Sequence, residues 1–185
     1  MRESGQHEFG TLRHLIVRFG RSLWPSGPGV ADEAWARQWL RPDEVPLWSA
    51  MTGPDRRHGV AVARRVATNL GNADGAGVPR RALAAALLHD AGKNGARLGV
   101  LGRSGATFLA LGLGRGRVAT WSETRSGWLR EAGRYAAHDR IGAELLASAA
   151  SDPLVVAWAR EHHLSPAEWT VEEPLASVLK AADDD

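Results

Sequence analysis

Residues 87–93 read LLHDAGK, and they end an apolar helix that we expect to begin at Pro79 and stop at Gly92. Leu83, Leu87 and Leu88 recur in it at the spacing of a helix face. His89 and Asp90 follow on the same helix, where neighbouring side chains point about 100° apart. Both can still reach one ion that lies between their directions. This stretch predicts a helical fold with a metal-binding group at a helix end.

Outward from this stretch the sequence is helical in both directions. Pro54 suits the first turn of a long helix ending near Leu70, and further helices are expected after His138, Asp152 and Pro174. No stretch alternates with a period of two residues for long enough to predict a strand. We therefore expect an all-α fold, in one domain over residues 1–185.

Residues 1–53 are expected to form an N-terminal helical extension. Leu12, Leu15, Ile16, Phe19 and Leu23 repeat at helical spacing with arginines between them, which is typical of a basic amphipathic helix. Such a helix docks on its own domain or a dimer partner, or lies on an anionic membrane. A second helix is expected from an Asp32 cap, with Pro42 as its end. A homodimer through these helices is one arrangement that the sequence allows.

Composition excludes several function classes. The 185 residues include no cysteine, which rules out disulfides, thiolate zinc sites and cysteine nucleophiles. The formal net charge is +2, too balanced to predict nucleic-acid binding. No apolar run reaches the roughly 20 residues that a membrane span needs. The first residues lack the apolar core of a secretory signal, so we expect a cytoplasmic protein.

Histidines and aspartates occur at helix positions that lean inward. Alone, each has an ordinary explanation: a histidine on an apolar face is usually a core residue, and a His-His pair is often a solvated helix end. Together they suit a borderline metal such as Fe, Mn, Co, Ni or Zn, and one aspartate can bridge two ions through its two oxygens. The candidate ligands are His58, His89, Asp90, His138, His162, His163 and Asp183.

The order H…HD…H…HH…D resembles the HD superfamily of metal-dependent phosphohydrolases. The matching stretches are HGVAVAR from His58, LLHDAGK, HDRIGAELL from His138, Glu161-His-His and Lys180-Ala-Ala-Asp183. They span residues 54–183. The set of five histidines and two aspartates resembles the binuclear branch, which includes cyclic-dinucleotide phosphodiesterases.

This resemblance implies an HD-domain helical bundle over residues 54–185 that holds two divalent transition-metal ions, mainly Fe or Mn. One ion would be held by His58, His89, Asp90 and Asp183, and the other by Asp90, His138, His162 and His163. Asp90 and Lys93 would be catalytic, and Lys93 and Arg57 would contact the substrate phosphate. The implied reaction is hydrolysis of a phosphoester, in a nucleotide or cyclic dinucleotide, by a metal-activated water.

The sequence departs from the family pattern in two places. The residues after His163 read LSPAEW where the cyclic-di-GMP enzymes carry GYP, and 49 residues (138 − 89) separate His89 from His138. We expect the inserted segment 95–128 to form a lid or a docking surface. Helical phase also leaves Asp185 open beside Asp183 as the last ligand.

Two other functions remain open on these residues. A mixed-valent diiron oxygenase of the HD fold would use the same ligands. A catalytically weak module that binds metal or nucleotide would also retain them.

Overall fold

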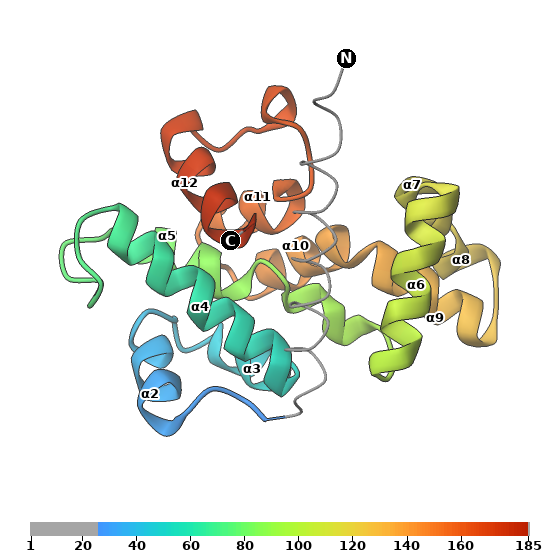
Figure 1. Cartoon of the computed structure of the whole chain (residues 1–185), viewed down its shortest axis with the longest axis horizontal. Coiled ribbons are helices and arrows are strands. Elements are labelled where there is room, and N and C mark those ends of the chain that lie inside the picture. The colour runs from blue at the N-terminus through green and yellow to red at the C-terminus, as the bar shows by residue number, and fades with distance from the viewer. Residues whose placement is uncertain (1–25, 185) are drawn as a thin grey trace, which may run out of the picture.

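The computed structural model of the chain describes residues 26–184, and every regular element in that range is a helix (Figure 1). The all-α prediction is confirmed for this range. The predicted helix 12–23 and the alternative ligand Asp185 lie outside the described residues.

In chain order the elements are α2 (Val30–Gln38), α3 (Val45–Ala50), α4 (Gly53–Asn69), α5 (Arg80–Leu88), the 3-10 helix η1 (Ala91–Gly95), α6 (Val100–Leu113), α7 (Arg115–Ala119), α8 (Trp121–Thr124), α9 (Gly127–Ala136), α10 (His138–Ser148), α11 (Pro153–Glu161), the 3-10 helix η2 (Pro166–Glu168) and α12 (Glu173–Asp184).

Helix α5 is the centre of the core. Its residues 82–88 are all buried, because the helix is apolar on every side and α4, α11 and α12 pack around it. The same core takes side chains from α2 and α3, including the fully buried Trp48, whose indole N–H donates to a carboxylate oxygen of Glu33 at 2.9 Å. Residues 30–51 therefore share one hydrophobic core with α4, α5, α11 and α12.

Helix α5 ends four residues earlier than the sequence predicts. Its last residue is Leu88, His89 is its C-cap, and the chain then turns into η1. The reason is tertiary: a Cβ atom on Gly92 would lie 1.9 Å from the carbonyl oxygen of His138 and 2.5 Å from the amide nitrogen of Gly142. The backbone of η1 thus packs against the first turn of α10 at a distance that only glycine allows.

Helix α2 also differs from its prediction at both ends. Its N-cap is Gly29, and Asp32 lies within the first turn, where its carboxylate pairs with Arg64 at 3.3 Å. The helix ends at Gln38, before Pro42. A negative charge in the first turn interacts favourably with the positive end of the helix dipole. Asp32 therefore stabilises this end of α2 without capping it.

The inserted segment folds into helices α6 to α9. In Figure 1 these helices stand to one side of the others, and they join the rest of the chain where α9 contacts η1 and α10. In the described part of the chain, no helix combines the length and apolar character that crossing a membrane requires.

Candidate metal centre

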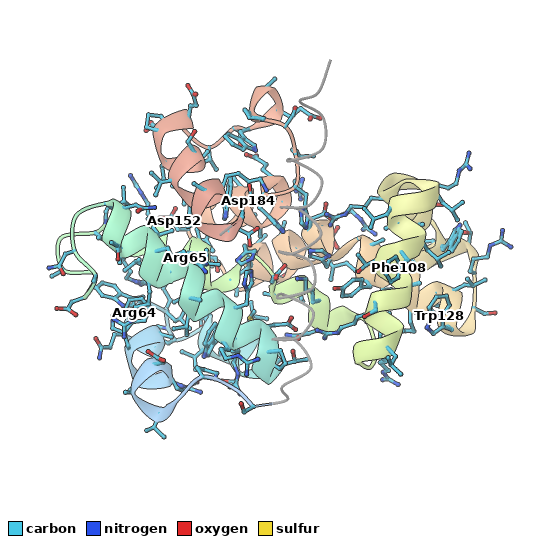
Figure 2. The ribbon with its side chains drawn as sticks, viewed as in Figure 1. Arg64, Arg65, Phe108, Trp128, Asp152 and Asp184 are labelled. Atoms are coloured by element: carbon cyan, nitrogen blue, oxygen red, sulfur yellow. The ribbon has the colours of Figure 1, made fainter. Side chains whose placement is uncertain are left out.

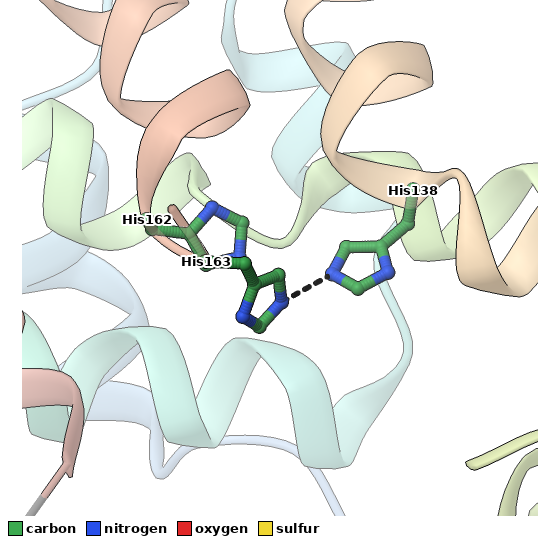
Figure 3. A group of neighbouring side chains, drawn as sticks. All are labelled: His138, His162 and His163. Carbon is green, nitrogen blue, oxygen red and sulfur yellow. Dashed lines mark hydrogen bonds between the residues drawn. The ribbon is translucent and has the colours of Figure 1, made fainter. Parts of the chain in front are cut away.

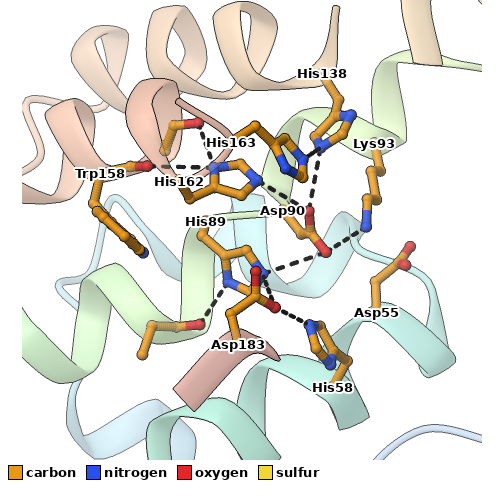
Figure 4. Close-up of polar contacts among 12 residues, drawn as sticks. Asp55, His58, His89, Asp90, Lys93, His138, Trp158, His162, His163 and Asp183 are labelled. Atoms are coloured by element: carbon orange, nitrogen blue, oxygen red, sulfur yellow. Dashed lines mark hydrogen bonds and ion pairs between the residues drawn. The ribbon is translucent and has the colours of Figure 1, made fainter. Parts of the chain in front are cut away.

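Five helices bring the seven predicted ligands to one place (Figure 4). His58 lies on α4, His138 is the first residue of α10, and Asp183 lies in the last turn of α12. The pairs His89-Asp90 and His162-His163 follow directly after α5 and α11. Five of the seven are buried, His58 is half-buried and His163 is exposed. Helix ends supply six of the seven.

The ligand atoms form two groups. His58, His89 and Asp183 offer atoms that all lie within 4.8 Å of one another, and so do His138, His162 and His163. Figure 3 shows the second group, in which the Nε2 atoms of His163 and His138 are 3.2 Å apart.

Asp90 lies between the two groups. Its Oδ2 is 3.4 Å from His89 Nε2, in the first group. Its Oδ1 is 3.4 Å from His138 Nε2 and 3.8 Å from His162 Nε2, in the second. One carboxylate therefore faces both groups through different oxygens, which is the arrangement that a bridging ligand requires.

Backbone contacts decide which nitrogen each buried ring offers to the centre. The Nδ1 atoms of His89, His138 and His162 lie 2.9, 2.7 and 3.0 Å from the backbone carbonyl oxygen three residues earlier. A carbonyl only accepts hydrogen bonds, so each Nδ1 carries a proton and donates it. Burial lowers the pKa of His138 and His162, which keeps these rings neutral and leaves a lone pair on Nε2.

These lone pairs are evidence that the residues fit a metal ion. His162 Nε2 is buried without any hydrogen-bond partner, and a carboxylate oxygen of Asp90, which also only accepts, lies 3.8 Å from it across the centre. Two facing acceptors are unfavourable unless a cation lies between them. Two ligand atoms that each lie about 2.1 Å from one tetrahedral metal ion are about 3.4 Å apart. The distances from the Asp90 oxygens to the histidine Nε2 atoms are close to this value. These buried groups could hold a metal ion.

Lys93 balances the charge of Asp90. Its Nζ lies 2.5 Å from Asp90 Oδ2, because the 3-10 geometry of η1 places residues three apart on the same side. Burial by itself would raise the pKa of the Asp90 carboxyl, but Lys93 and His89 hold it well below its usual range. Burial likewise lowers the pKa of Lys93, and Asp90 outweighs that effect and raises it. Both groups therefore stay charged near neutral pH.

Two arginines bear on the predicted phosphate contact. Arg57, predicted to contact phosphate, donates to the carbonyl and hydroxyl oxygens of Ser26 at 2.5 and 3.3 Å. Arg115 contacts a candidate ligand: its Nη2 is 3.4 Å from His138 Nδ1 and 3.3 Å from Asp139 Oδ2. No sequence signal singles out Arg115, because it comes from the inserted segment and only the packing of α7 on α9 brings it here.

Comparison of the chain with protein-family models, with curated proteins and with solved structures finds no match. The helical arrangement and its histidine-aspartate groups are compatible with an HD-like fold. Function must therefore be inferred from the residues and their geometry.

Proposed function

We propose that this chain is a metal-dependent phosphohydrolase of the HD type that acts on a phosphoester of a nucleotide or cyclic dinucleotide. The observation that carries the proposal is the position of Asp90. Its two oxygens face two groups of histidines, with the Nε2 atoms of His89, His138 and His162 3.4, 3.4 and 3.8 Å away. A charged lysine lies beside the same carboxylate.

Two divalent ions would be held by the two groups, with Asp90 common to both. His58, His89 and Asp183 complete the first set, and His138, His162 and His163 complete the second. Such ions, when bound, polarise a phosphate and lower the pKa of bound water toward neutral.

Lys93 is suited to bind the substrate phosphate. Its ammonium group stays protonated, and it is fixed beside Asp90 at the edge of the centre, with its side chain partly exposed. It can donate hydrogen bonds to a phosphate oxygen and stabilise the negative charge that grows there during ester cleavage. Arg115, about a third exposed next to His138, supplies a second cation on the side of α10. A planar guanidinium suits two phosphate oxygens at once.

The experiment that tests this proposal measures metal content and phosphate-ester hydrolysis on the same samples. Metal is counted by elemental analysis of protein purified without chelator or nickel resin. Hydrolysis is assayed with bis-p-nitrophenyl phosphate, nucleotides and cyclic dinucleotides in Mn²⁺. We expect about two ions per chain and turnover of at least one substrate.

Two variants make the test specific. Asp90→Ala should lose metal and turnover together, whereas Asp184→Ala, an exposed carboxylate paired with Lys180, should keep both. Turnover that survives in Asp90→Ala, or protein that holds no metal after reconstitution, would refute the proposal. Oxygen consumption with substrate in place of ester cleavage would assign the centre to an oxygenase.

A further inference from the structure

The inserted helices carry most of the exposed apolar side chains. We call helices α6 to α9, residues 100–136, the arginine lobe. Among the described residues, nine large hydrophobic side chains are exposed, and six of them belong to this lobe. The six, with their exposed fractions, are Leu101 (81%), Phe108 (74%), Leu111 (72%), Leu113 (42%), Trp128 (44%) and Leu129 (39%).

Three of these side chains form one face of α6. Leu101, Phe108 and Leu111 are seven and three residues apart, which puts them on the same face of the helix. A Cβ atom on Gly102 or Gly105 would lie 3.4 or 3.1 Å from the indole of Trp128, so this side chain lies against α6 beside that face. Figure 2 shows Phe108 and Trp128 on the lobe. An apolar face of this extent on a helix surface marks an interaction site.

The lobe is also strongly basic. Residues 100–136 contain six arginines and two glutamates, a net charge of +4 (6 − 2), whereas residues 138–184 contain nine acidic and three basic residues. Arg117, Arg125 and Arg130 are exposed and make no ion pair with another described residue. The lobe that carries the apolar face therefore has a net positive charge that ion pairs only partly compensate, which favours a negatively charged partner.

Charge argues against two other occupants of this face. A second copy packed lobe to lobe about a two-fold axis would bring equal positive charges together. Residues 1–25 contain four arginines and two glutamates, so they carry the same sign of charge as the lobe.

We propose that the arginine lobe binds the surface of membranes rich in anionic lipid. Phe108, Leu101 and Trp128 enter the interface, and the exposed arginines contact the headgroups. An apolar helix face on an arginine-rich lobe, with a tryptophan beside it, has the composition of helices that lie in this interface. The 14 residues of α6 are about 21 Å long, shorter than the roughly 30 Å hydrocarbon layer, so the helix lies along the surface.

The test is flotation of the full chain with vesicles of phosphatidylcholine alone and with vesicles in which about a third of the lipid is phosphatidylserine. We expect binding to the second kind only. The double variant Phe108→Ser, Leu111→Ser should bind about tenfold or more weakly, because it removes apolar surface that the interface buries. The matched control Leu70→Ser, Leu145→Ser changes exposed leucines outside the lobe and should bind as the parent does.

A charge variant completes the test. Arg117→Glu with Arg125→Glu should also lose binding, since each arginine near an anionic surface contributes about 1 kcal/mol, or about fivefold in affinity. Absence of binding to phosphatidylserine vesicles would overturn the proposal, as would unchanged binding of the Phe108→Ser, Leu111→Ser variant. If sedimentation shows that the parent is a dimer and that the Phe108→Ser, Leu111→Ser variant is a monomer, the apolar face binds a second copy of the chain, and the membrane proposal is overturned. Metal content is measured on the same samples, so failure here is distinct from failure of the proposed phosphohydrolase.

Discussion

Replacing Gly92 by alanine should displace the segment that carries Asp90 and Lys93. The new Cβ atom would lie 1.9 Å from the carbonyl oxygen of His138 and 2.5 Å from the amide nitrogen of Gly142. Carbon atoms in contact are normally about 3.5–4.0 Å apart, so the overlap is more than 1 Å. Both neighbouring atoms are backbone, and no side-chain rotation relieves the clash.

The cost follows from this geometry. One extra methyl group in a packed interior costs about 1–3 kcal/mol where side chains can adjust, so we expect about 3 kcal/mol or more here. For a chain of this size that corresponds to a melting temperature about 6–12 °C lower. The relaxation must separate η1 from α10, so Asp90 moves away from His138, and we expect the variant to hold less metal than the parent.

Gly95→Ala is the matched control in the same 3-10 helix. Its Cβ atom would meet only the methyl groups of Ile141, at 3.3 and 3.7 Å, and that side chain can shift. We expect its free energy of unfolding to change by less than about 1 kcal/mol. Denaturant unfolding and elemental analysis of both variants are the assay. A Gly92→Ala protein that unfolds like the parent and holds the same metal would refute the close contact between η1 and α10.

Three further predictions concern the centre itself. Asp183→Asn should lower the metal content measured by elemental analysis, whereas Asp184→Asn should not, because only the first carboxylate is buried at the centre; equal losses would contradict this assignment. Lys93→Met should destabilise the metal-free protein by about 3 kcal/mol or more in denaturant unfolding, since it leaves the buried Asp90 charge without its partner. The loss of stability should be smaller when metal is added. An equal loss with and without metal would contradict this role of Lys93. Finally, burial holds the pKa of His162 in the metal-free protein well below its ordinary value of 6.5. Above pH 6.5 the folded and unfolded forms are both neutral, and below it only the unfolded form gains the proton, so stability falls as pH falls. This residue alone should remove about 1.4 kcal/mol at one pH unit below that value, and a flat stability curve between pH 7 and about 5.5 would contradict it.

Sequence reasoning located the candidate site better than it located the ends of the helices. The seven candidate ligands are chemically distinctive residues at helix ends, so their order along the chain was informative before any contact was known. The ends of α2 and α5 were predicted wrongly, because caps and prolines are local signals while these ends depend on packing. Gly92 is the clearest case: its neighbours are His138 and Gly142, which lie far away in the sequence.

The sequence by itself determined the all-α class, the apolar central helix and the set of residues that can bind a metal. Helical periodicity depends only on residues close together in the chain, and side-chain chemistry depends only on residue type. Tertiary structure alone decided which nitrogen of each histidine faces Asp90, since that depends on backbone carbonyls in the folded helix ends. It also decided that Arg115 lies beside His138, and that the inserted helices leave an apolar face uncovered on a basic lobe. Those outcomes depend on distances between segments that no local pattern contains.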